Sequence, residues 1–273
     1  MQVDFDFTGK HVVVFGGTTG INFGIAQAFA RQGAKLTVAS RKLENVEAAV
    51  AELHRHGGEV HGVCADVRDF DAVGRALQAS VERFGAIDVL VSGAAGNFLC
   101  EAADMSSNGF KVVVDIDLVG SFHVLRHAHA HLRKPGASVI SITAPQSFVP
   151  MRYQAHACAA KAGVDQLTRV LALEWGGEGV RINSISPGPI DGTEGFRKLM
   201  APSAAERASA QDAVPLKRFG SLDDIANLAL FLASPYAGYI SGALIPCDGG
   251  GAFESVKPAL EAAGQAMAAA GAS

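Results

Sequence analysis

The residues with the clearest chemistry form a turn of glycines and small polar side chains. The apolar run 12–15 leads directly into Gly16, Gly17, Thr18, Thr19, Gly20, Ile21 and Asn22. Apolar residues then recur at helical spacing, which predicts a strand, a tight turn and a helix. Glycines let the backbone approach a ligand, and the free N–H groups at a helix start attract phosphate. The turn therefore predicts a dinucleotide site, although its spacing differs from G-x-G-x-x-G and a turn without a ligand is the alternative.

Residues that follow the later strands fit the same kind of ligand, because ligands bind beyond the carboxyl ends of strands in α/β sheets. Arg41 and Lys42 follow Ser40, where an NAD-selective enzyme usually carries an acid, and two cations there favour the 2′-phosphate of NADP. Solvated charges at a helix start are the alternative. Further NADP contacts are predicted at Asp66, Val67, Ala94, Ala95, Gly96, Pro187, Gly188, Pro189 and Ile190.

Strands and helices alternate along the chain and must position these residues. Strands are predicted at 12–15, 35–40, 60–66, 87–92, 138–143, 180–185 and 243–247. Besides the helix after the glycine turn, helices are predicted at 43–56, 69–84, 107–132, 154–175 and 222–233. This alternation predicts an α/β fold with a parallel, doubly wound sheet flanked by helices.

Composition limits the class of protein. The 273 residues are 49% hydrophobic, which favours one large core and a single domain. A net charge of −4 does not favour a nucleic-acid partner. No apolar run reaches the roughly 18 residues of a membrane span, and residues 1–10 lack a secretory signal, so a cytoplasmic protein is expected.

The four cysteines do not suggest a metal site or a disulfide framework. No C-x-x-C spacing occurs, and buried thiols are expected at Cys64, Cys100, Cys158 and Cys247.

As a set, these motifs resemble the short-chain dehydrogenases/reductases over about residues 8–251. The matching segments are the glycine turn, 93–96, Lys161 with its following helix, VRINSISPGPI and CDGG at 247–250. The resemblance implies a single Rossmann-type NADP-binding domain over 1–255, with a substrate-loop insertion at about 190–215 and a tail at 256–273. It also implies that Thr143 and Lys161 contact the cofactor, and that helices 107–132 and 154–175 pack between subunits of a homotetramer.

Three of the family's four usual catalytic residues are absent. In the usual Tyr-x-x-x-Lys motif, Ala157 stands four residues before Lys161. The usual serine falls on Ala144, and the usual asparagine falls on Asp117. An ordinary alcohol dehydrogenase needs the tyrosine hydroxyl to move a proton to or from a carbonyl oxygen. This chain is therefore not expected to follow the usual carbonyl chemistry.

One branch of the family, the 2,4-dienoyl-CoA reductases, lacks the same tyrosine, and the chain looks most like their peroxisomal type. The similar segments are AAGNFLC at 94–100, DID at 115–117, HACAAKA around Lys161 and PGPIDGTEGFRKL at 187–199. The resemblance implies NADPH-dependent reduction of 2,4-dienoyl-CoA to 3-enoyl-CoA in unsaturated fatty acid oxidation. The ending Gly-Ala-Ser is not a Ser-Lys-Leu-type peroxisomal address, which fits a bacterial cytoplasmic relative.

That resemblance suggests a role for each site residue. Asp117 is expected to hold or polarise the water that protonates a substrate carbon near the thioester. Lys161 is expected to bind the nicotinamide ribose and to stabilise the developing oxyanion. Asn97 and Phe98 are predicted to meet the acyl chain or the thioester. The phosphates of coenzyme A are assigned to Arg68, Arg197 and Lys198.

Several of these residues have structural alternatives. Asp117 could instead bond a backbone group of its helix, and Arg68 could be a solvated charge. Asp115 faces elsewhere on the helix and is expected to be structural. His156 is more simply a satisfied structural histidine than a proton donor. No metal is expected, because a polar helix face explains His123, His127, His129 and His131.

Three functions remain open from the sequence. The first is a dienoyl-CoA reductase. The second is a reductase or dehydrogenase of another enoyl thioester or a ketone, with Tyr153 or His156 as its acid. The third is an NADP-binding regulatory protein without catalysis, against which the retained Lys161 argues.

Overall fold

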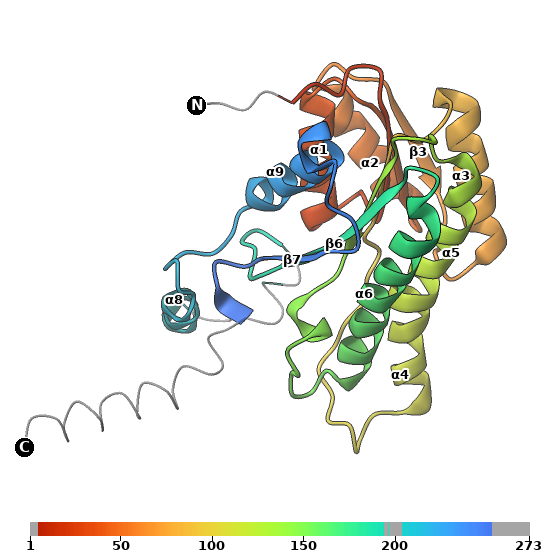
Figure 1. The fold of residues 1–273 in the computed structure, drawn as a ribbon. Coiled ribbons are helices and arrows are strands. Elements are labelled where there is room, and N and C mark those ends of the chain that lie inside the picture. The colour runs from red at the N-terminus through yellow and green to blue at the C-terminus, as the bar shows by residue number, and fades with distance from the viewer. Residues whose placement is uncertain (1–4, 194–195, 197–203, 253–273) are drawn as a thin grey trace, which may run out of the picture.

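Seven parallel strands form one sheet in the order β3-β2-β1-β4-β5-β6-β7 in the computed structural model, which describes residues 5–193, 196 and 204–252 (Figure 1). The strands are β1 (His11–Phe15), β2 (Lys35–Ser40), β3 (Val60–Cys64), β4 (Val89–Ser92), β5 (Ser138–Ile142), β6 (Arg181–Pro187) and β7 (Leu244–Cys247). The chain order reverses beside β1, which pairs with both β2 and β4. This confirms the predicted parallel, doubly wound sheet and puts the ligand-binding crevice of such folds beyond the end of β1.

Helices cover both faces of the sheet (Figure 1). The helices of one face are α1 (Gly20–Arg31), α2 (Leu43–His54) and α9 (Leu222–Ala233). Those of the other are α3 (Phe70–Phe84), α5 (Gly120–Ala128) and α6 (Ala155–Gly176). Helix α4 (Ser107–Val114) packs beside α6, and α8 (Ala204–Ala213) lies in the segment predicted as a substrate loop.

The apolar run of β1 explains why the sheet is covered on both sides. Val12 and Val14 point into the core with Phe29 of α1, whereas Val13 and Phe15 point into the core with α3 and α5. Successive side chains of a strand alternate between faces, so a continuous apolar run suits a strand buried on both. Both cores lie directly behind the glycine turn and hold it in place.

The long helix predicted at 107–132 is present but is not one continuous α-helix. Between α4 and α5, residues Asp115–Val119 form a π-helical turn, and Asp117 lies in its middle. Residues His129–His131 end the stretch as a 3₁₀ turn. Such π turns often occur at functional sites because they re-aim a side chain.

Two expectations concern regions that the structure describes only in part. The predicted tail 256–273 lies outside the described residues, as do residues 194–195 and 197–203 of the segment 190–215. Within the described part, no helix is both long enough and apolar enough to cross a membrane.

The expectation of buried thiols is wrong for Cys64. That side chain is exposed, with its Sγ donating to the carbonyl oxygen of Arg41 at 3.3 Å, while Cys100, Cys158 and Cys247 are partly buried. Cys64 ends β3, which is the edge strand of the sheet and therefore has one open side.

Candidate active site

The glycine turn and the ends of β2, β3 and β4 surround a cavity of about 540 Å³. Twelve of the predicted NADP contacts line this first cavity: Gly16, Thr18, Thr19, Asn22, Ser40, Arg41, Lys42, Asp66, Val67, Ala94, Ala95 and Gly96. They come from four separate segments, which the switch in strand order brings together. The structure thus forms one crevice where the sequence predicted a dinucleotide.

Close packing at the base of this cavity leaves no room for side chains. A Cβ atom on Gly16, which has a φ of +75°, would lie 3.0 Å from the backbone nitrogen of Ala94. A Cβ atom on Gly93 would lie 2.3 Å from Oδ1 of Asn22. Asn22 donates from Nδ2 to the carbonyl oxygen of Gly93 at 2.7 Å and leaves its buried Oδ1 without a partner. This cradle fits a ligand that passes close to the backbone and brings its own donor.

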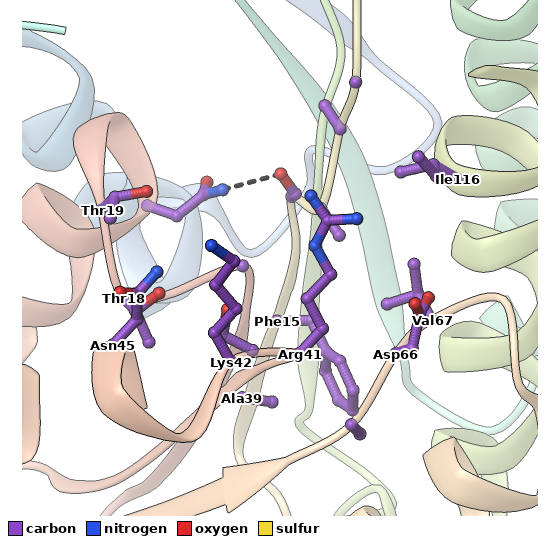
Figure 2. Close-up of a pocket in the computed structure, with 18 residues that line it drawn as sticks. Phe15, Thr18, Thr19, Ala39, Arg41, Lys42, Asn45, Asp66, Val67 and Ile116 are labelled. Atoms are coloured by element: carbon purple, nitrogen blue, oxygen red, sulfur yellow. Dashed lines mark hydrogen bonds between the residues drawn. The ribbon is translucent and has the colours of Figure 1, made fainter. Parts of the chain in front are cut away.

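Arg41 and Lys42 extend into the first cavity between Thr18 and Asp66 (Figure 2). In the described part of the chain, no carboxylate lies within ion-pair distance of either cation. Asp66 is already paired with Arg68, whose Nη2 lies 2.6 Å from Oδ2, and this hydrogen bond lowers the pKa of Asp66. Two unpaired cations in a crevice suit an added phosphate.

A second cavity of about 460 Å³ adjoins the first and is mostly apolar. The two share Asn22, Gly93, Ala95 and Gly96. The second cavity is also lined by the predicted residues Ile21, Asn97, Asp117, Thr143, Lys161, Pro187, Gly188 and Pro189. A ligand in the first cavity can therefore meet a second molecule in the next one.

A buried ion pair forms the polar wall of the second cavity. Oδ2 of Asp117 lies 3.2 Å from Nζ of Lys161, and the two side chains are only 1% and 9% exposed. The other carboxylate oxygen accepts a hydrogen bond from the Gly96 N–H at 2.7 Å. Lys161 also donates to the carbonyl oxygen of Ile142 at 3.2 Å. The pair is held by Gly96 on one side and Ile142 on the other, and it still faces the cavity.

No hydroxyl group stands where the family's tyrosine and serine would be. Ala144 and Ala157 line the second cavity instead. Near them, the buried Oγ1 of Thr143 has no hydrogen-bond partner. The arrangement offers one carboxylate, one ammonium group and an apolar wall, which together can direct a proton but supply no tyrosine-type acid.

The alternative proton donors are placed differently from the expectation. His156 is fully buried, yet neither ring nitrogen has a partner, so it is not the satisfied histidine that was expected. Burial lowers the pKa of His156, and its ring packs edge-on against Phe98 at 4.4 Å between ring centroids. Tyr153 is about half exposed. Neither residue lines the second cavity.

Some predicted residues are not brought into either cavity. Gly17, Gly20 and Ile190 shape the turns behind the cavities, and Phe98 covers His156. Arg68 is held by Asp66 on the outer side. Arg197 and Lys198 lie outside the described residues. The contacts of Arg68, Arg197 and Lys198 with the phosphates of coenzyme A therefore stay predictions.

Asp115 and two of the four helix histidines have partners within the protein. Asp115 pairs with Lys111 along its own helix. His123 contacts the carbonyl oxygen of Val67, and His129 pairs with Glu178.

Several cavity residues were missed by the reading of the sequence. Asn45 lines the first cavity, and the second is also lined by Leu99, Gln146, Met151, Gln154 and Phe196. Most of them lie in irregular segments, where no periodic pattern marks the side that faces a ligand. Leu99 follows β4 and Gln146 follows β5, and this position beyond a strand end is the signal that could have indicated them.

Comparisons with known proteins identify the family. A family model described as enoyl-(acyl carrier protein) reductase matches residues 16–252. A short-chain dehydrogenase structure from Bacillus anthracis superposes with a TM-score of 0.79 at 35% identity, covering 89% of this chain and 96% of that one. The chain belongs to the short-chain dehydrogenase/reductase family. It is an oxidoreductase, as predicted.

Two relatives within this family bear on the branch. The peroxisomal 2,4-dienoyl-CoA reductase [(3E)-enoyl-CoA-producing] of Pongo abelii is 42% identical to this chain. The match covers 88% of this chain and 83% of the relative. The probable 2,4-dienoyl-CoA reductase [(2E)-enoyl-CoA-producing] of Bacillus subtilis is 38% identical over 88% and 96%. The predicted resemblance to this branch is confirmed.

Proposed function

We propose that this protein reduces 2,4-dienoyl-CoA to 3-enoyl-CoA with NADPH. The observation that carries the proposal is the buried pair of Asp117 and Lys161, which faces a mostly apolar cavity without a tyrosine hydroxyl. A conjugated thioester needs a proton on carbon rather than on an alkoxide, so the missing hydroxyl is no obstacle. The names of the relatives from Pongo abelii and Bacillus subtilis support the same substrate class.

The first cavity fits NADPH because its base is a close-packed backbone cradle and its rim carries two unpaired cations. Arg41 and Lys42 would hold the 2′-phosphate, and the glycine turn would hold the pyrophosphate. The unpartnered oxygens of Asn22 and Thr143 would receive donors from the nicotinamide end. NADPH supplies the hydride when it is bound.

The residues of the second cavity would stabilise the charge that develops on the thioester oxygen and direct the proton to the substrate carbon. As the far carbon of the diene gains hydride, electron density moves to the thioester oxygen, and the ammonium group of Lys161 stabilises that charge. Asp117 orients a water that gives its proton to the carbon next to the thioester, which leaves the remaining double bond at the 3-position. Gly96 and Lys161 fix the carboxylate for this step.

The site of protonation decides the product and is open to direct test. A proton on the carbon next to the thioester gives the 3-enoyl ester, and a proton two carbons further along gives the 2-enoyl ester. NMR of the product formed in D₂O reads the position of both the double bond and the deuterium. Deuterium next to the thioester is the expected result, and deuterium two carbons further along contradicts the proposal.

The reaction itself is tested by the loss of NADPH absorbance when the protein meets a 2,4-dienoyl-CoA. NADH with the same substrate and NADPH with a simple ketone are the controls. Rapid oxidation only with NADPH and the dienoyl ester is expected. Protein that binds NADPH but leaves the dienoyl ester unreduced would contradict the proposal.

We also propose that the protein is a cytoplasmic homotetramer. Four apolar side chains on the helices assigned to the subunit contacts are exposed, and these are Phe110, Phe122, Val170 and Leu173. Burying such a surface against a second copy removes it from water. Sedimentation of the wild type should give four times the monomer mass, and Leu173→Glu should reduce that mass.

A further inference from the structure

Three side-chain amides meet at one end of the second cavity. Gln154 accepts at Oε1 from Nδ2 of Asn97 at 2.6 Å and from Nε2 of Gln146 at 3.0 Å. Nε2 of Gln154 has only the sulfur of Met151, at 3.9 Å. All four side chains line the cavity, whose remaining wall is mostly apolar. The side chain of Asn97 is exposed and those of Gln146 and Gln154 are partly buried, so a ligand in the cavity can reach this polar cluster.

The cluster retains unused groups whichever way each amide is turned. Three primary amides carry six N–H groups and three oxygens, and two contacts join them. Both donors and acceptors therefore remain. In the structure, Oε1 of Gln146 is buried and has no hydrogen-bond partner. The unused groups call for a ligand that brings both an N–H and a C=O.

The cluster is neutral and held in place. Within the described residues, no charged side chain hydrogen-bonds to any of the three amides. The Cys100 N–H donates to the carbonyl oxygen of Tyr153 at 2.9 Å, which ties the Asn97 segment to the Gln154 segment. Tyr153 has a φ of +66°, a conformation that a non-glycine residue keeps only when its surroundings hold it. A neutral, fixed cluster suits a neutral polar group rather than a phosphate.

We propose that Asn97, Gln146 and Gln154 form a subsite for the secondary amide of the thiol arm that carries the acyl group. In such an arm, an amide nitrogen lies two carbons from the thioester sulfur. Its N–H can reach the free oxygen of Gln146 while its carbonyl accepts from a free amide N–H. A thioester carbonyl alone would satisfy donors and leave that oxygen unpaired. The inference rests on the proposed thioester substrate and adds how its carrier is recognised.

The test compares one dienoyl group on two small thiols. N-acetylcysteamine keeps the amide nearest the sulfur, and pentanethiol replaces it with methylenes of equal length. For the wild type, kcat/KM should be about tenfold higher with the amide-bearing ester, as two neutral hydrogen bonds predict. In Gln154→Leu and in Gln146→Leu this ratio should fall to about one to two. Gln78→Leu, at an exposed glutamine of α3, is the matched control and should keep the wild-type ratio.

The ratio is internal to each variant, so a partly folded preparation does not distort it. An unchanged ratio in both cavity variants, with NADPH binding intact, overturns the inference. Calorimetric binding of the corresponding saturated esters to the protein with NADP⁺ gives the same comparison without turnover. If the dienoyl ester is not reduced but the binding ratio still depends on Gln154, the proposed function fails and the subsite stands.

The same arm occurs on coenzyme A and on acyl carrier proteins. Comparing the reduction rates of a dienoyl ester of coenzyme A and the same ester of an acyl carrier protein shows which carrier the protein uses. Faster reduction of the coenzyme A ester is expected. A faster carrier-protein ester would keep the subsite and contradict coenzyme A as the carrier.

Discussion

Near the amino end of the sheet, the buried side chains of His11, Thr37 and Ser80 are all hydrogen-bonded, whereas Asn22 and Thr143 at the carboxyl end each keep an unpartnered atom. The ring of His11 contacts the carbonyl oxygen of Gly85 at 2.8 Å and both hydroxyl groups at 3.0–3.2 Å. An unpaired buried polar group costs stability. The three hydrogen-bonded residues thus contribute to the stability of the fold, whereas the open groups of Asn22 and Thr143 lie beside the cavities.

Charged groups follow the same division. At the amino end, Asp88 accepts from the His11 N–H at 3.0 Å and from Arg133 at 2.6 Å, and these bonds lower its pKa against the effect of burial. At the carboxyl end, Asp117 and Lys161 are paired but face a cavity. A carboxylate enclosed by its partners supports structure, and one that faces a cavity can act on a substrate.

The largest expected effect comes from Asp117→Asn. The variant keeps the oxygen that accepts from Gly96 but loses the negative charge, so kcat for the dienoyl ester should fall about 100-fold or more. Steady-state kinetics at saturating NADPH measure it. Asp115→Asn, two residues away on the same π turn, is the control and should stay within about twofold of wild type. A wild-type rate in Asp117→Asn would show that the proposed proton route is wrong.

A smaller change is expected when both Arg41 and Lys42 are replaced by Ala. Losing charge-assisted bonds to the 2′-phosphate should raise KM for NADPH about 10- to 100-fold and leave KM for NADH unchanged. The control is Arg55→Ala, which removes a cation that lies beyond the other end of α2. An equal rise in KM for NADPH and NADH would mean that the two cations do not bind the 2′-phosphate.

At the amino end, Asp88→Ala should lower stability without lowering activity. Lys10 and Arg133 are half exposed and contribute little, but the His11 N–H is left unpaired, so the free energy of unfolding should fall by about 1–3 kcal/mol. Urea unfolding measures the loss, and kcat should stay within about twofold. A smaller loss is expected for Asp223→Ala, which breaks an exposed pair with Arg31. A large fall in kcat would contradict the assignment of Asp88 to stability alone.

The smallest effect concerns pH. Burial lowers the pKa of both His11 and His156 below the ordinary value of 6.5. Below pH 6.5 these histidines bind protons in the unfolded chain but stay neutral in the folded chain. Their contribution to stability is therefore complete above pH 6.5 and is lost as the pH falls towards their lowered pKa values in the folded state. The melting temperature should fall between pH 7 and pH 5. His156→Leu should reduce this fall, and an unchanged slope would contradict a neutral, buried His156.

The sequence was sufficient for features that depend on local pattern. The strand, glycine turn and helix at 12–31 lie within one segment, and alternation of apolar runs carries the rest of the sheet. Predicted strand ends lie within two residues of those in the structure, as at 60–66 against Val60–Cys64. The pairing of Asp117 with Lys161 joins residues 44 positions apart, and only the family resemblance placed them in one site.

The rest depended on contacts that no local pattern carries. Asn97, Gln146 and Gln154 come from two irregular segments, and an amide has no periodic signal. The unpaired state of His156 was missed because its neighbours come from other segments of the chain. The π turn was missed because it spans only Asp115–Val119 within a longer helical stretch, which is too short to show a period of its own.

The π turn at Asp115–Val119 also predicts which kind of change this gene tolerates least. The turn accommodates an extra residue within a helix, so removing one residue there would restore regular α-helical spacing. Each residue of an α-helix advances about 100° around the axis, so a residue of the turn that shifts by one position would point about 100° away from its present direction, although α4 and α5 could keep their places. Asp117 would then leave Gly96 and Lys161 while the helix itself stayed whole. Loss of a single codon in this segment should therefore be more harmful to function than most substitutions beside it.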